Sequence, residues 1–161
     1  MNPDEKKKLL VLRFNNYKNN DFIVEHKKII DKNGAVWLLK LGKPVPKKAL
    51  EEILLNTGGL ILKAPKARGG NFYYCKMLDA RNSRPDSNMK FPEYYKEMMD
   101  DLFWFSFEGT WIKVEWFREL GDSEISKLKL ISNDRGLSEV LMQTRTTMLY
   151  AYSTDGERAF R

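Results

Sequence analysis

A chain of 161 residues with 42% hydrophobic residues is long enough for one domain with a buried core, without disulfides or metal ions to staple it. A single cysteine, Cys75, excludes an internal disulfide and a cysteine-based zinc site; its apolar neighbours predict a small buried side chain in a reducing compartment. The net charge of +6 is concentrated, because residues 40–68 carry seven Lys or Arg against two Asp or Glu. Such a concentration favours a surface that faces a polyanion.

Membrane and secretory signals are missing from the sequence. The charged residues 1–8 precede only about four apolar ones, too few for the core of a signal peptide. No stretch approaches the roughly 20 apolar residues of a membrane span. We therefore expect a soluble, cytoplasmic protein with no membrane partner.

The first half of the chain predicts alternating strands and helices. Residues 9–14 (LLVLRF) are an apolar run typical of a buried strand. Asp21 is a good N-cap for a helix over residues 22–32, and Gly34 ends that helix as a left-handed terminator. The next predicted elements are a strand over residues 35–41, an amphipathic helix over 47–55 and a strand over 60–64.

In the second half, residues 65–71 (PKARGGN) predict a basic, glycine-rich hairpin loop. The alternation in residues 111–117 (WIKVEWF) predicts a half-buried strand. Strands over 72–78 and 128–131 and a short helix over 94–102 complete the pattern. This order predicts an α+β fold, a small curved or barrel-like β-sheet flanked by two or three helices. We expect one domain over residues 1–152 and a polar tail or linker over 153–161.

Groups for catalysis are scarce. His26 is the only histidine, and its helix face is rich in Ile and Phe, which favours a packing or capping role over catalysis. Phosphate-loop, dinucleotide and metalloprotease motifs do not occur. We therefore expect a binding domain rather than an enzyme, with no cofactor and no resident metal. Scattered acids keep a magnesium-dependent nuclease open as an alternative, and its candidate ligands are Asp79, Asp100, Asp101 and Glu115.

Several aromatic residues lie beside predicted loops instead of in the middle of strands. Trp37 follows Gly34 closely, Tyr94 and Tyr95 follow Pro92, and Trp104 precedes another glycine. Aromatic rings beside basic loops are the surfaces on which proteins stack an unpaired or flipped base. A methylated base gains further, because its methyl group prefers an apolar wall to water.

The order of these motifs resembles the YTH branch of the PUA-like fold, which is related to the EVE domains. The resemblance covers roughly residues 9–150 and is one of pattern rather than long identity. The segments that carry it are LRFNNYKNNDF, NGAVW, GGLILKAPKARGGNFYYCKMLDA, TWIKVEWFREL and SEVLMQTRTT. The loop at about residues 82–107 does not align residue by residue, so the identity of the second cage aromatic stays open, with Trp104 as the first choice.

The resemblance implies a role for each candidate residue. Trp37 and a second aromatic, chosen from Trp104, Tyr94 and Tyr95, would sandwich a base. The amides of Asn15 and Asn16 and a backbone carbonyl near Leu38 would hydrogen-bond its Watson–Crick edge. Basic side chains would hold flanking phosphates without sequence choice, and these are Arg13, Lys40, Lys43, Lys66, Arg68 and Arg145.

These roles imply a reader of a modified base, with N6-methyladenine in DNA as the favoured ligand. Related prokaryotic domains resemble the N-terminal recognition modules of McrB-type modification-dependent restriction systems, so we expect a fused or associated motor or nuclease domain. Methylated cytosine, or methylated RNA read as YTH domains read it, are the nearer alternatives. The nuclease and a protein-interaction domain with an incidental basic patch are alternatives from other classes.

Overall fold

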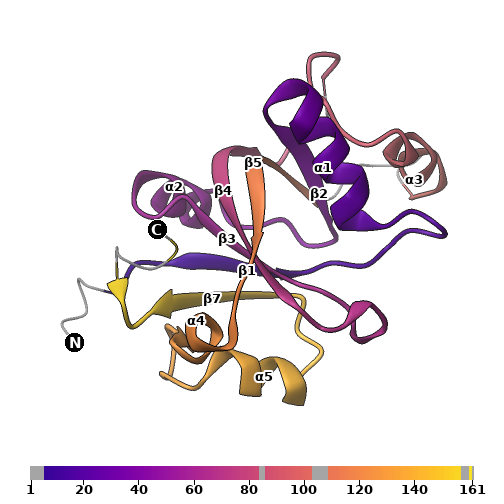
Figure 1. The fold of residues 1–161 in the computed structure, drawn as a ribbon. Coiled ribbons are helices and arrows are strands. Elements are labelled where there is room, and N and C mark those ends of the chain that lie inside the picture. Colours follow the sequence, from indigo (N-terminus) through magenta and orange to yellow (C-terminus); the bar gives the residue numbers. More distant parts are fainter. Residues whose placement is uncertain (1–5, 84–85, 103–108, 157–159, 161) are drawn as a thin grey trace. The chain divides into compact units, whose positions relative to one another are not determined.

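The computed structural model describes residues 6–83, 86–102, 109–156 and 160, apart from the side chains of Asp101 and Leu102 (Figure 1). Within these residues the chain is an α+β protein with a seven-stranded mixed sheet and five α-helices. In chain order the elements are β1 (Leu9–Arg13), α1 (Phe22–Asn33), β2 (Val36–Leu41), α2 (Lys47–Leu55), β3 (Gly59–Lys63), the 3-10 helix η2 (Lys66–Arg68), β4 (Phe72–Arg81), α3 (Tyr94–Leu102), β5 (Gly109–Glu119), α4 (Asp122–Ser126), β6 (Leu128–Leu130), α5 (Leu137–Gln143) and β7 (Met148–Ser153).

The strands are hydrogen-bonded in the order β2-β5-β4-β3-β1-β7-β6. Strand β1 runs parallel to β3, whereas the β1–β7, β2–β5 and β6–β7 pairs are antiparallel. Over the described residues, β2 and β6 end this order and no pairing between them closes the sheet into a barrel. The predicted α+β class is confirmed. The helices outnumber the expected two or three because α4 and α5 lie in segments for which no helix was predicted.

The chain divides into two compact units, each built from separate segments. The first unit comprises Met1–Phe14, Glu52–Cys75 and Arg118–Arg161, and the second comprises Asn15–Glu51 and Lys76–Phe117. The elements α2, β4 and β5 therefore each run from one unit into the other. The expected tail boundary at residue 153 falls on the last residue of β7, and Ser153 is buried.

In the first unit, the neighbouring strands β1, β3 and β7 supply the core. Leu10 and its partner in the parallel register, Leu60, are both completely buried. Helix α5 contacts the edge strand β6 and packs against α4 (Figure 1). Cys75 on β4 is completely buried, as its apolar neighbours predicted, and burial raises the pKa of its thiol.

In the second unit, local sequence determines where α1 begins and ends. The Asp21 carboxylate accepts a hydrogen bond from the backbone N–H of Val24 at 3.0 Å, as an N-cap does. Gly34 adopts a left-handed conformation with φ of 84° and donates its N–H to the Ile30 carbonyl. Both predicted ends of the helix are confirmed, and α1 packs beside β2.

Candidate nucleic-acid interface

Trp37 lies on β2 at the centre of an aromatic cluster in the second unit. Its side chain is only 6% exposed. The cluster consists of buried residues together with partly buried ones packed against them, namely Trp37, Leu39, Met89, Tyr94, Tyr95, Met98 and Trp111 with Tyr17, Phe91 and Met99. Since residues 89–99 supply more than half of this set, the segment that runs into α3 covers the face of β2 that carries Trp37.

The backbone N–H and C=O groups of successive residues in β2 are directed alternately toward β5 and toward the outer edge of the strand. The Trp37 N–H donates to the Lys90 carbonyl at 2.8 Å, and the Leu39 N–H donates to the Tyr95 hydroxyl at 3.2 Å. Leu38, between them, is opposite Ile112 in the antiparallel register. Alternation along the ladder directs the Leu38 carbonyl toward β5 and the carbonyls of its two neighbours toward the outer edge. The edge carbonyls nearest to Leu38 therefore belong to Trp37 and Leu39.

Tyr95 is a structural residue of the cluster. It is 1% exposed, and its hydroxyl group lies 2.5 Å from Nε2 of His26, which is itself completely buried. Burial raises the pKa of the Tyr95 hydroxyl and lowers that of His26 to about 4. The packing role predicted for His26 is confirmed, and the Tyr95 ring is fixed by hydrogen bonds at its polar end.

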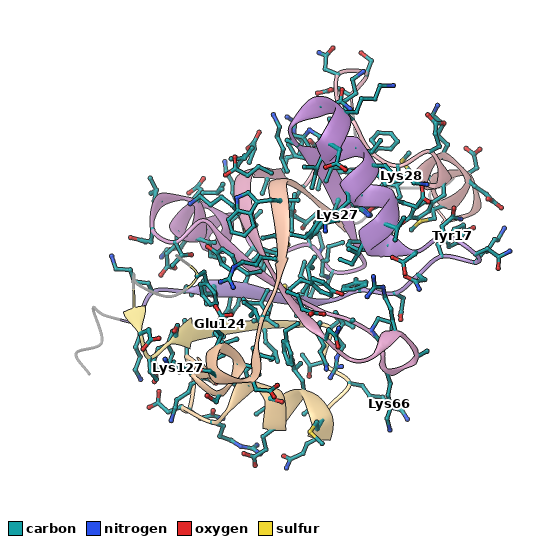
Figure 2. The ribbon with its side chains drawn as sticks, viewed as in Figure 1. Tyr17, Lys27, Lys28, Lys66, Glu124 and Lys127 are labelled. Atoms are coloured by element: carbon teal, nitrogen blue, oxygen red, sulfur yellow. The ribbon has the colours of Figure 1, made fainter. Side chains whose placement is uncertain are left out.

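Tyr94 stacks on Tyr17, a residue that sequence reasoning did not single out. The two rings lie 5.9 Å apart with an interplanar angle of 14°. Tyr94 is buried and Tyr17 is half-buried, in the loop that leads into α1 (Figure 2). The signal was present in the sequence, because Tyr17 follows directly after Asn15 and Asn16. The structure thus brings a partly exposed aromatic ring next to the two predicted amides.

Asn15 and Asn16 are both exposed. The side-chain amide oxygen of Asn16 accepts a hydrogen bond from the backbone N–H of Phe22 at 2.8 Å, which ties the loop to the start of α1. An amide carries an acceptor oxygen and a donor NH2 group. With its oxygen engaged by α1, Asn16 offers its NH2 group for contact with an acceptor on a ligand.

A planar cation lies over Trp37. The guanidinium carbon of Arg81 is 4.7 Å from the centroid of the indole ring, within the range of a cation–π contact. Arg81 also donates to Asp86 at 2.8 Å and lies 3.8 Å from Asp79. The pKa of Asp86 is held below its usual value, first by the Asn88 backbone N–H and then by Arg81.

Trp111 is completely buried in the same cluster, packed against Phe91 and Tyr95. In the part of the chain that the structure describes, its indole N–H has no hydrogen-bond partner. Buried polar groups are nearly always paired, and an unpaired one costs about 1–3 kcal/mol. Trp111 therefore brings an unsatisfied donor into the cluster that contains Trp37.

In the first unit, Arg13 is bound to the last turn of α5 and to the segment that connects α5 and β7. Its guanidinium group donates to three backbone carbonyls, those of Leu141 at 2.5 Å, Thr144 at 2.7 Å and Thr146 at 3.0 Å. The predicted phosphate ligand Arg145 is an exposed residue of the same segment. Arg13 thus holds the backbone on either side of Arg145.

The other predicted phosphate ligands are divided between the two units. In the first unit, Lys66 is exposed on the loop between β3 and β4 (Figure 2). Arg68, on the same loop, donates to the Tyr73 hydroxyl at 2.7 Å. In the second unit, Lys40 donates to the backbone carbonyl of Lys43, which is exposed. Each unit therefore carries an exposed cation among the predicted phosphate ligands.

The remaining candidates bear on the cage and on the nuclease alternative. Trp104, the first choice for the second cage aromatic, lies outside the described residues, as does the Asp101 side chain. Among the residues that are described, no three His, Cys, Asp or Glu side chains form a group that could hold a metal ion. Asp79 makes an ion pair with Arg81, and Asp100 is exposed on α3.

Comparison with known proteins gives no assignment, because no family model, curated protein or solved structure matches the chain. Over the described ranges, the helices lack the length and apolarity that crossing a membrane requires. Any function must therefore be argued from the residues themselves.

Proposed function

We propose that this protein binds nucleic acid and holds a single modified base, with N6-methyladenine in DNA favoured, against the aromatic cluster around Trp37. It performs no chemistry itself, and it serves in the cytoplasm as the recognition module of a restriction or defence system whose motor or nuclease is fused or associated. The proposal includes a curved, PUA-like arrangement of the sheet.

The observation that carries this proposal is the unpaired indole N–H of Trp111 in the cluster that contains Trp37, within the residues that the structure describes. A nucleobase offers what such a cluster lacks, because it has flat π faces for stacking and ring nitrogens that accept hydrogen bonds. A purine in contact with this cluster would stack on one tryptophan and supply an acceptor to the other. The methyl group of N6-methyladenine adds apolar surface, which the Met and Leu side chains of the cluster favour over water.

The Asn-rich loop supports recognition of the base edge. Asn16 has its oxygen on the Phe22 N–H and its NH2 group left to donate, whereas Asn15 is exposed and has both groups to offer. Tyr17 places an aromatic ring beside these amides through its stack on Tyr94. Polar groups that read an edge and rings that hold a face thus occur together in the second unit.

The charge distribution supports binding to a phosphate backbone. Lys43 on the second unit and Lys66 and Arg145 on the first are exposed. Contacts between such cations and phosphates contribute affinity without sequence preference and weaken as salt rises. Selectivity must then come from the aromatic cluster.

The test is fluorescence-polarisation binding of single-stranded DNA with and without one N6-methyladenine, at two salt concentrations. We expect tighter binding to the methylated strand, and Trp37→Ala should remove that preference, since base–aromatic stacking contributes about 1–3 kcal/mol. Trp116→Ala is the matched control, because Trp116 is half-buried and lies outside the cluster. Circular dichroism verifies that both variants fold.

Other outcomes would reject the proposal in distinct ways. Equal, salt-sensitive binding of both strands would leave a nonspecific basic binder, and no binding would favour a protein-interaction domain. A methylated RNA strand that binds more tightly than DNA would make the protein a YTH-type reader of RNA. Magnesium-dependent cleavage that Asp100→Ala abolishes would identify a nuclease.

A further inference from the structure

Trp37 needs a second wall to hold a base, and the tyrosines of the cluster are engaged elsewhere. Tyr94 stacks on Tyr17, and the hydroxyl group of Tyr95 is hydrogen-bonded to His26. Of the described residues, Arg81 is the one whose cationic group lies over the indole, with its guanidinium carbon 4.7 Å from the ring centroid. A guanidinium group is flat, and proteins use it as they use aromatic rings to stack on a base.

We propose that Arg81 is the second wall of the base site, so that the modified base inserts between the Trp37 indole and the Arg81 guanidinium. The inference rests on the proposed function and names the specificity-determining partner of Trp37. The cage is then one aromatic ring and one cation plane, in place of two aromatic rings.

The ion pairs of Arg81 keep its plane near Trp37. Asp86 accepts from its Nη1 at 2.8 Å, and Asp79 lies 3.8 Å from its Nη2. Both carboxylates are close to Arg81 in sequence and lie on the same unit, so they restrain the cation at its edge. An edge restraint leaves a face for stacking, as bidentate guanidinium pairs do elsewhere.

Insertion of a base requires the guanidinium to lift from the indole by the thickness of one base. The side chain of Arg81 is about one-third exposed, and its methylene groups give it the freedom to move. This movement exchanges the single cation–π contact between Arg81 and Trp37 for two stacking contacts with the base, one on each of its faces.

The plane of Arg81 can be separated from its charge by substitution. Arg81→Lys keeps the charge and removes the plane, whereas Arg81→Ala removes both. Lys43→Ala is the matched control, because it removes an exposed cation on the same unit that does not lie over Trp37. Each variant is titrated with the methylated and the unmethylated single strands, and its thermal melt is recorded to verify folding.

We expect both Arg81 variants to lose roughly 5- to 100-fold in preference for the methylated strand, and Lys43→Ala to weaken both strands equally. If Arg81→Lys keeps the wild-type preference for the methylated strand, only the charge of Arg81 contributes to binding. If Arg81→Ala binds DNA more tightly than the wild type, the Arg81 side chain blocks access to Trp37. Either result overturns the second-wall role alone. A wild-type protein without any preference for the methylated strand would overturn this role and the proposed function together.

Discussion

The hydroxyl group of Tyr95 joins two elements of the second unit, since it lies 2.5 Å from Nε2 of His26 and also accepts the Leu39 N–H. With its oxygen accepting, the hydroxyl group donates its own proton to Nε2. His26 is then protonated at Nδ1, which donates to the Phe22 carbonyl at 2.6 Å. This series of hydrogen bonds connects β2, α3 and α1 and fixes the neutral form of the imidazole.

Tyr95→Phe should therefore lower the free energy of unfolding. It leaves two buried groups, the Leu39 N–H and Nε2 of His26, without their partner, at a cost of about 1–3 kcal/mol. Urea denaturation measures this decrease. Tyr150→Phe is the matched control, because the described residues give the buried Tyr150 hydroxyl no partner, so its removal should leave stability unchanged or raise it. Equal decreases in both variants would contradict the hydrogen-bonded role of Tyr95.

The buried His26 predicts a loss of stability in weak acid. Its pKa is lowered from 6.5 to about 4 in the folded protein, mainly by burial, whereas the unfolded chain keeps the ordinary value. Below pH 6.5 the unfolded state binds a proton that the folded state does not, so stability falls as the pH drops from 6.5 toward 4. It levels off below that, after a decrease of up to about 3 kcal/mol.

Urea midpoints measured between pH 7 and pH 5 test this sign, because most carboxylates remain ionised in that range. His26→Gln is the comparison, since it removes the titrating group and keeps polar atoms for hydrogen bonds. The variant should show a smaller dependence on pH than the wild type. A wild-type midpoint that rises as the pH falls would show that His26 does not titrate as its burial requires.

Local signals were enough to predict most of the individual elements. Asp21 and Gly34 delimit α1 because a cap and a left-handed glycine act within one turn of the chain. Alternation in residues 111–117 predicted β5, which extends beyond that segment to Gly109–Glu119. In contrast, α5 was missed because it is short and follows a turn. Strand β7 was missed because one of its partners, β1, is distant in sequence and the other, β6, is only three residues long.

The candidate site was only partly predictable, because some of its contacts join residues that are far apart in the sequence. Trp37 was predicted to pair with one of Trp104, Tyr94 and Tyr95; Trp104 lies outside the described residues, and the two tyrosines share one cluster with Trp37. The contact between Arg81 and Trp37 spans 44 residues (81 − 37) and leaves no mark in either local sequence. The sequence shows Arg13 only as a basic residue in a predicted strand. Its hydrogen bonds to the backbone carbonyls that precede β7 become visible only in the folded chain.

Arg13 and Arg145 should respond in opposite ways to replacement. Arg13→Ala removes three hydrogen bonds to backbone carbonyls and should cost about 1–3 kcal/mol of stability. Arg145 is exposed, so Arg145→Ala should change stability by less than about 0.5 kcal/mol. Its removal should weaken binding to all DNA sequences alike and reduce the salt dependence by about one phosphate contact. Thermal melts and salt titrations separate the two roles. An unchanged salt dependence in Arg145→Ala would refute the phosphate contact of Arg145, and an unchanged melting temperature in Arg13→Ala would refute the structural role of Arg13.

The indole N–H of Trp111 can be removed without a change of shape. Trp111→benzothienylalanine, introduced by codon suppression, replaces the N–H by sulfur and retains the bicyclic ring. Because the donor is buried and unpaired within the described residues, the stability of the unbound protein should stay constant or rise by about 1 kcal/mol. Binding of the methylated strand should weaken by roughly 2- to 10-fold, the value of one hydrogen bond. The same replacement at Trp116 is the control and should leave the preference for the methylated strand unchanged. Unaltered binding in the Trp111 variant would mean that the Trp111 N–H does not contact the base.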